Sequence, residues 1–169
     1  MKEIVAELTH QARSSHDVSQ RSGVSVRMSV ANYENLVANS YRRAIRLAEK
    51  QAAPRISDLS AIQSSTQGKI ELETLGEVSD AAVLDRLISC AIIAVFNRTF
   101  AIRQFDRLVQ AFENGFEIEI SDMMPSMEYV HQLSHLDGIK EGIDTLGVGG
   151  NPAAVASAVE FILEGLHLN

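Results

Sequence analysis

Apolar residues recur at intervals of three and four along most of this chain, a period that is typical of helices rather than strands. The one clear alternating run, Lys69–Glu73, has no second run of matching quality nearby to pair with, so we interpret it as an extended or helical connection. The sequence therefore predicts an all-α fold. We expect a helical bundle with a long central helix and a small carboxyl-terminal helical subdomain.

The amino-terminal half is expected to form a short first helix, from about residue 2 to residue 14, and a long second one. The second helix is capped by Ser25, ends before Pro54, and carries an apolar stripe with its arginines largely on other faces. That stripe consists of Val26, Val30, Tyr33, Val37, Tyr41, Ala44, Leu47 and Ala48. A short helical segment follows at 56–62, and the polar run 63–68 is expected to break its periodicity.

The second half contains a very long helical pattern that begins after Ser79, a plausible N-cap, and stops at Gly115. It predicts one long helix or two nearly continuous ones. The acidic segment 116–125 predicts a hinge between two units, residues 1–113 and residues 114–169. Beyond the hinge we expect three helices, and an Asn-Pro pair at 151–152 opens the last of them.

Charge and hydropathy restrict the class of partner. The 169 residues suit one domain or a domain with a small appendage, and the 46% apolar composition can supply a core. Twenty-two acidic residues against 15 basic ones give a formal net charge of −7, and no block of lysine and arginine offsets it. This balance argues against nucleic acid as a main partner.

Neither a membrane span nor a secretory leader is predicted. The most apolar stretch, Leu87–Phe96, is about half the length that crosses a bilayer, so we expect a buried core helix there. Cys90 within it is expected to be a small buried hydrophobic residue, and a single cysteine cannot form an intramolecular disulfide. No cationic segment followed by an apolar one opens the chain. These features predict a cytoplasmic protein with no membrane partner.

Arg27 is the main candidate site residue. If Ser25 is the N-cap, Arg27 is the second residue of its helix and faces the positive end of the helix dipole, which is unfavourable by about 0.3–1 kcal/mol. An anion nearby would offset this, although Arg27 taken alone could instead extend into solvent or pair with an acidic residue. Arg21, in the loop before the turn, is a second candidate or a solvated loop cation. The arginines at 42, 43 and 46 form a basic patch whose default interpretation is a solvated helix face.

Three further groups of residues suggest chemistry that the sequence supports less well. Glu128, His131 and His135 share one helical face and could bind a metal ion, but a solvated polar face is the simpler interpretation, and we expect no metal site. The glycines at 147–150 precede a helix and could hold phosphate, yet no strand or Lys-Ser/Thr pair accompanies them. The acidic residues Glu117, Glu119 and Asp122 lack a partner base and are interpreted as a solvated edge. With no phosphate loop and no catalytic triad, the chain by itself is not expected to be a complete enzyme.

A resemblance to a known family begins at the turn before Arg27. The string Gly23-Val24-Ser25-Val26-Arg27, followed by residues 28–33, resembles the sensor 2 motif of AAA+ ATPases of the MoxR and magnesium-chelatase branch. In that motif a Gly-Ala-Ser-Pro-Arg-like turn opens a lid helix; the glycine, serine and arginine match, and valines replace the small residue and the proline. Strings at 54–59, 68–73 and 158–168 extend the similarity across nearly the whole chain.

The resemblance implies that this chain is the helical lid, residues 1–113, and the trailing helical segment of a larger ATPase whose nucleotide-binding core lies on the amino-terminal side. Met1 would then not be the natural start. Arg27 would contact the γ-phosphate of ATP, in its own or a neighbouring subunit, and couple hydrolysis to lid movement in a ring. ATP and Mg²⁺ would be cofactors of the full-length protein, and none is expected in this fragment.

The expected partners are the missing AAA+ core, neighbouring subunits of the ring and an unidentified protein that the ATPase remodels. A different class of function remains open alongside this one. The chain could be a free-standing helical adaptor that binds a protein through an exposed apolar groove, without nucleotide chemistry.

Overall fold

The computed structural model describes residues 1–19, 23–67, 69–71, 79–133 and 138–169. Within these residues the protein is all-α, as predicted, and the described ranges contain no strand but only isolated bridge residues, as at Gln67 and Ile70. The helices are α1 (Lys2–Ser14), α2 (Val26–Arg46), η1 (Ile56–Ala61), α3 (Ile62–Thr66), α4 (Asp80–Thr99), η2 (Ile102–Phe105), α5 (Asp106–Glu113), α6 (Ser126–Leu133), α7 (Ile139–Thr145) and α8 (Pro152–His167), where η marks a 3-10 helix. None of them is both long enough and apolar enough to cross a membrane.

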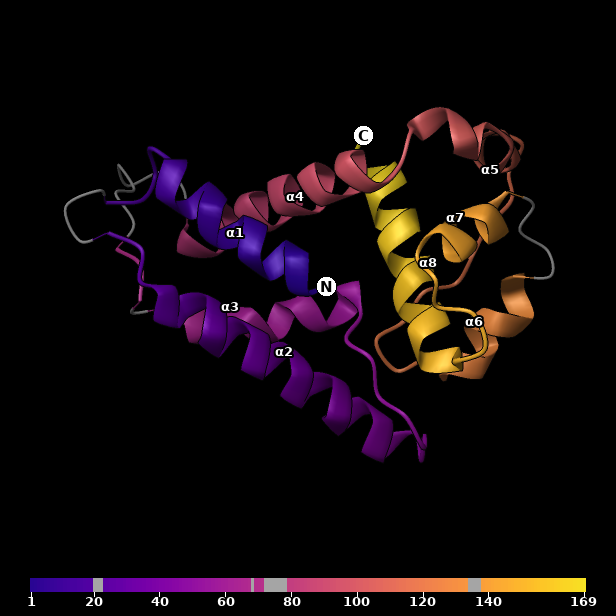
Figure 1. Ribbon diagram of the computed structural model, residues 1–169, viewed down its shortest axis with the longest axis horizontal. Coiled ribbons are helices and arrows are strands. Elements are labelled where there is room, and N and C mark those ends of the chain that lie inside the picture. Colours follow the sequence, from indigo (N-terminus) through magenta and orange to yellow (C-terminus); the bar gives the residue numbers. More distant parts are fainter. Residues whose placement is uncertain (20–22, 68, 72–78, 134–137) are drawn as a thin grey trace.

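Two layers of helices form the amino-terminal part of the fold, and α8 stands between them and the carboxyl-terminal helices (Figure 1). In the first part, α1 packs along α4 and α2 packs along α3. In the second part, α6 and α7 both pack against α8. The expected boundary after residue 113 falls in the turn that follows α5, and one hydrophobic core receives residues from both sides of it.

The pair α1 and α4 is sealed by apolar residues and bordered by ion pairs. Ile4, Val5 and Leu8 of α1 are buried because they share one helical face. At the border, Arg98 of α4 donates a 2.7 Å hydrogen bond to Glu7, which is mostly buried. That hydrogen bond holds the pKa of the Glu7 carboxyl below its ordinary value.

The Glu7 contact predicts a pH dependence of stability. Because the pKa of Glu7 is lower in the folded protein, its stabilising effect is present above its ordinary pKa of 4.5 and is lost as the pH falls through the folded value. A Glu7→Gln variant should therefore lose less stability than the wild type when the pH drops below about 4.5. Urea unfolding followed by circular dichroism at pH 7 and pH 3.5 measures the difference. Equal losses in both proteins would contradict the assignment.

Helix α2 begins at Val26, as predicted, but it buries a different face from the one its apolar stripe suggests. The stripe is largely solvent-exposed: Val26 is 66% exposed, Val30 55% and Tyr41 60%. The buried face shares only Ala44 with the stripe and otherwise consists of Met28, Asn32, Leu36, Ser40 and Arg43. The helix also ends at Arg46, well before Pro54.

Polar pairing explains how α2 can bury such a face. Asn32 donates to the hydroxyl of Thr66 at 3.0 Å and accepts from the hydroxyl of Ser65 at 2.7 Å, and all three residues are buried. The polar run at 63–68 was expected to be irregular, but its first residues continue into α3. The hydroxyl groups of Ser65 and Thr66 contact Asn32 of α2 and also donate to the carbonyl oxygen of Ile62 in their own helix, so both polar side chains are satisfied inside the fold.

The long pattern after Ser79 forms two main helices with a short 3-10 helix between them. Ser79 caps α4 through a 3.3 Å hydrogen bond to the amide of Ala82, as predicted. Phe100 has extended backbone dihedrals and ends α4. Its ring packs against the rings of Phe96, Phe105 and Phe161 at centroid distances of 5.2–6.0 Å, so the break is fixed by an aromatic cluster.

Cys90 differs from expectation. The residues around it on α4 form a buried face that includes Leu87, Ala91 and Val95, as the apolar stretch predicted. Cys90 itself is exposed, because it falls on the opposite side of the helix. The prediction of a buried cysteine was therefore wrong.

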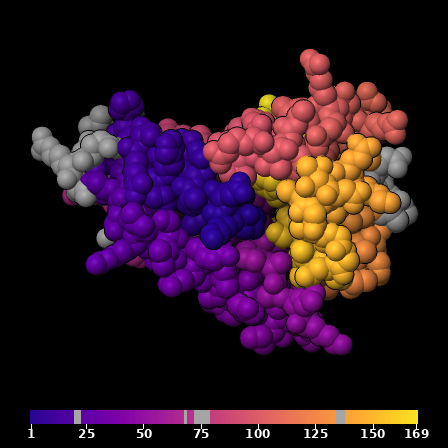
Figure 2. Space-filling model, in the orientation of Figure 1, coloured from indigo at the N-terminus to yellow at the C-terminus, as the bar shows by residue number. Residues whose placement is uncertain are grey.

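Helix α8 is the most buried helix in this part of the fold. Asn151 caps it by accepting hydrogen bonds from the amides of Ala153 and Ala154, and Pro152 occupies its first turn, as predicted. A cavity of about 370 Å³ lies between α8 and the start of α1, where Figure 2 shows the surface hollowed between the indigo and yellow segments. Met1, Val148 and Ala154 are among the residues that line it.

Candidate anion site at the start of helix α2

The turn before α2 has the backbone geometry that its sequence predicts. Gly23 has a φ of +65°, a left-handed conformation that glycine adopts without strain. Ser25 is extended and acts as the N-cap, and its hydroxyl accepts a 3.2 Å hydrogen bond from the amide of Arg27. Arg27 is therefore the second residue of a helix of 21 residues.

A residue of α1 holds this turn in place. Arg13, in the last turn of α1, donates from Nε and Nη2 to the carbonyl oxygen of Val24, each at 3.3 Å. The carbonyl lies three residues before Arg27, so α1 fixes both the turn and the direction in which α2 leaves it. The position of Arg27 is thus set by two helices rather than by a free loop.

Arg27 itself is exposed and, within the described part of the chain, its guanidinium has no hydrogen bond or ion pair. The first turn of α2 contains no acidic residue. A cation at this end of a helix opposes the helix dipole, and here the described residues supply no carboxylate to offset it. Because a guanidinium offers five donors in a planar fork, this arrangement can bind a phosphate or carboxylate that approaches from outside.

The other predicted cations divide into three cases. Arg21 lies outside the described residues, so its prediction is not tested. Arg42 and Arg46 are exposed, as expected of a solvated helix face. Arg43 is not: it is only 5% exposed, pairs with Asp58, and donates to the carbonyl oxygen of Ala53 at 2.7 Å. The basic patch is therefore smaller than predicted, because one of its three members joins α2 to η1.

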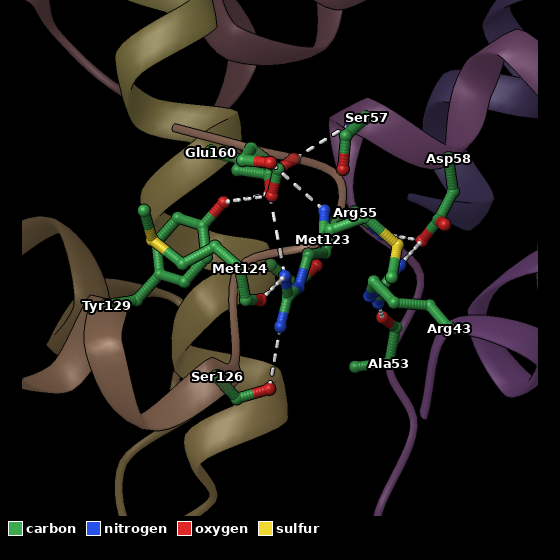
Figure 3. Close-up of polar contacts among 12 residues, drawn as sticks. Arg43, Ala53, Arg55, Ser57, Asp58, Met123, Met124, Ser126, Tyr129 and Glu160 are labelled. Carbon is green, nitrogen blue, oxygen red and sulfur yellow. Dashed lines mark hydrogen bonds and ion pairs between the residues drawn. The ribbon is translucent and has the colours of Figure 1, made fainter. Parts of the chain in front are cut away.

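A second buried arginine, Arg55, lies at the centre of a polar cluster that the sequence did not reveal (Figure 3). Its side chain is 0% exposed and donates to the carbonyl oxygen of Met124 at 2.8 Å and to the hydroxyl of Ser126 at 2.7 Å. The Glu160 carboxylate is 4.0 Å from Nη1 and the Glu49 carboxylate 3.9 Å from Nη2. Two carboxylates thus compensate one buried cation.

Tyr129 and Glu160 complete the Arg55 cluster. The ring of Tyr129 lies under the guanidinium at 4.8 Å from its centroid, and its hydroxyl donates to Glu160 at 2.6 Å. Burial and the Glu160 carboxylate together raise the pKa of Tyr129, while burial, with Arg43 nearby, lowers the pKa of Arg55. The other oxygen of Glu160 accepts from the amide of Ser57 at 2.8 Å. Arg55, Tyr129 and Glu160 are each bonded to another part of the chain, so this cluster links the start of η1 to α6 and α8.

One sequence signal could have indicated this cluster. Glu160 stands alone in the apolar run Ala158–Leu163. A single acidic residue inside a run that must be buried needs a cation or several donors beside it. The sequence could not show which cation pairs with Glu160, because Arg55 is far from it along the chain.

The remaining candidate groups do not come together as sites. His131 and Glu128 are exposed, and Nδ1 of His131 is 3.9 Å from a carboxylate oxygen of Glu128, while His135 lies outside the described residues. Within the described ranges, no three His, Cys, Asp or Glu side chains could hold a metal ion. The glycines at 147–150 precede α8, but the amides of Ala153 and Ala154 at the start of that helix already donate to the side chain of Asn151. The acidic side chains at 117, 119 and 122 are exposed.

Comparisons with protein-family models, with curated proteins and with solved structures found no match for this chain.

Proposed function

We propose that this chain is the helical lid and trailing helical segment of a magnesium-chelatase-like AAA+ ATPase, in which Arg27 is the sensor 2 arginine that contacts the γ-phosphate of ATP. In this proposal the lid couples ATP binding and hydrolysis to subunit rearrangement and to remodelling of a partner protein. ATP and Mg²⁺ bind to the full-length protein, in a ring of subunits. The motif Gly23-Val24-Ser25-Val26-Arg27 suggests the family, and the structure supplies one supporting observation.

That observation is an unpaired cation beside an uncovered apolar face. Arg27 has no partner among the described residues, and Val26, Val30 and Tyr33 beside it on α2 are exposed. Burying each such side chain is worth about 1.5–3 kcal/mol, so a helix face of this kind favours contact with another protein surface. A nucleotide-binding core that covers the start of α2 would bury the apolar residues and bring a phosphate to Arg27.

The chemistry of phosphoryl transfer explains why an arginine would serve here. Negative charge spreads over the γ-phosphate oxygens in the transition state, and a guanidinium can donate two hydrogen bonds to them. Lysine is a point charge without the planar fork, so it is a poorer substitute. The capped turn and the Arg13 contact fix the first turn of α2, so movement of the lid would carry Arg27 with it.

Arg27→Ala is the test of this role. In the full-length ATPase we expect the variant to lower ATP turnover about tenfold or more, since the transition state loses a charged donor. Arg27→Lys should recover only part of the rate. The matched control is Arg42→Ala, which removes an exposed arginine from the same helix and should leave turnover within about twofold.

Two outcomes would reject the proposal. If the Arg27→Ala variant keeps the ATP turnover of the wild type and has the same circular dichroism spectrum, Arg27 does not contact the γ-phosphate. If the reading frame upstream of Met1 encodes no phosphate-binding loop, the assignment of this chain to an ATPase is wrong. The isolated chain should bind ATP too weakly for calorimetric detection, because the proposed phosphate-binding residues lie on the core.

A further inference from the structure

We infer that a second surface, formed by α5, the end of α8 and the start of η1, is a docking pocket for a basic, apolar segment of a partner protein. The pocket is distinct from Arg27 and does not rest on the proposed ATPase role. It has a volume of about 600 Å³, within the range of about 300–1,000 Å³ that ligand pockets occupy. Its apolar lining is provided by Ile56, Val109, Phe112, Ile120, Leu163 and Leu166.

The apolar lining is incompletely covered by the chain. Phe112 and Leu166 are only half-buried, and Ile120 is 45% exposed. Large side chains inserted by a partner would remove this apolar surface from water, which favours binding. The pocket is therefore an apolar cavity with an open mouth rather than a packing defect inside the core.

The charges around the pocket select the partner's chemistry. Glu113 and Glu164 lie at its border, and within the described part of the chain neither carboxylate has a hydrogen bond or ion pair. Among the described lining residues, His167 alone can carry a positive charge. Segment 116–122, which supplies Ile120, adds exposed acidic side chains. A basic partner complements this border, whereas an acidic one would be repelled.

The floor of the pocket also offers polar groups. Glu160, 2% exposed, lies there with its carboxylate already paired to Tyr129 and to the amide of Ser57. The hydroxyl oxygen of Ser57 is buried and has no hydrogen-bond partner among the described residues. An unsatisfied buried hydroxyl is unfavourable, and a donor or acceptor on the inserted segment would satisfy it. The carboxylates at the border favour a lysine or arginine next to the apolar anchor, and the Ser57 hydroxyl can accept from, or donate to, a polar group beside it.

Three synthetic peptides of about 14 residues test the inference with the 169-residue chain. The first is an amphipathic helix with leucines on one face and lysines on the other; the second replaces lysine by glutamate, and the third replaces leucine by serine. Fluorescence anisotropy at about 150 mM salt should show binding of the first peptide at least about tenfold tighter than that of either other peptide. Equal affinity for the glutamate peptide would overturn the charge assignment.

Matched protein variants locate the binding site. Glu113→Lys combined with Glu164→Lys should weaken binding of the lysine–leucine peptide about tenfold or more. The control pair, Glu34→Lys with Glu141→Lys, makes the same change in net charge at exposed positions on α2 and α7 and should leave affinity within about twofold. Equal weakening by both pairs would show general attraction to an acidic protein and would overturn the inference.

Methyl NMR distinguishes this pocket from the exposed stripe of α2. Addition of the lysine–leucine peptide should shift the methyl signals of Ile120, Leu163 and Leu166 and leave those of Val26 and Val30 unchanged. Shifts confined to the two valines would assign the peptide to α2 and reject the pocket. Because Arg27 takes no part in this measurement, the outcome is separate from that of the ATPase test.

Discussion

An Arg55→Ala variant should lose about 3–5 kcal/mol of its free energy of unfolding, the range for breaking a buried ion pair from one side. Removal of the guanidinium leaves the Glu160 carboxylate in the interior without its cation and deprives Ser126 and the Met124 carbonyl of their donors. Exposed Arg42→Ala, which also removes an arginine, should change stability by no more than about 0.5 kcal/mol. Urea unfolding at pH 7 measures both values.

The double variant Arg55→Met with Glu160→Leu separates charge from packing. If the loss in Arg55→Ala comes from an uncompensated carboxylate, the double variant should recover a large part of it, because both charges are gone and apolar volume is retained. A loss below about 1 kcal/mol in Arg55→Ala would contradict the central position of this residue in the cluster.

Gly165→Ala should lower the free energy of unfolding by about 2 kcal/mol, although alanine is the better helix former by about 1 kcal/mol. Gly165 lies in α8 and is buried, and a Cβ added there would overlap the ring of Phe96. Phe96 is 0% exposed and contacts three other phenylalanine rings, so it has no free space to move into. The steric cost should therefore exceed the gain in helix propensity.

Thermal unfolding provides the measurement for Gly165, with Gly149→Ala as the control. A Cβ at Gly149 would meet nothing within 4 Å, and its φ is not in the left-handed range. A loss of 2 kcal/mol corresponds to a fall in Tm of about 4–8 °C for a chain of this size, whereas the control should remain within about 2 °C. A Gly165→Ala variant as stable as the wild type would show that the Phe96 ring can shift after all.

Most of the helical pattern could be predicted because it depends on local sequence. The caps at Ser25, Ser79 and Asn151 start their helices by bonding to amides two or three residues away, so a short string contains the whole signal. The choice of buried face on α2 could not be predicted in the same way. It depends on hydroxyl partners in α3, which lie about 34 residues along the chain.

In the candidate site, too, local features could be predicted from the sequence and long-range contacts could not. The Ser25 cap and the place of Arg27 as second residue of its helix were expected from the five-residue string Gly23–Arg27. The pairing of Arg43 with Asp58, and that of Arg55 with Met124, Ser126 and Glu160, required knowledge of which helices meet. Long-range electrostatic pairs have no period in the sequence, so periodicity cannot reveal them.

The Arg55 cluster also has a consequence for the order of events during synthesis. Its hydrogen-bond partners Met124 and Ser126 follow it by 69 and 71 residues, and the Ser57 amide is separated from Glu160 by 103. A nascent chain that ends before α8 contains the cation but not the carboxylate of Glu160. Loop closure over this distance is slow compared with local helix formation. The amino-terminal helices can therefore form and pack on one another while the ribosome is still translating, whereas the Arg55 cluster can be completed only after α8, which carries Glu160, has emerged.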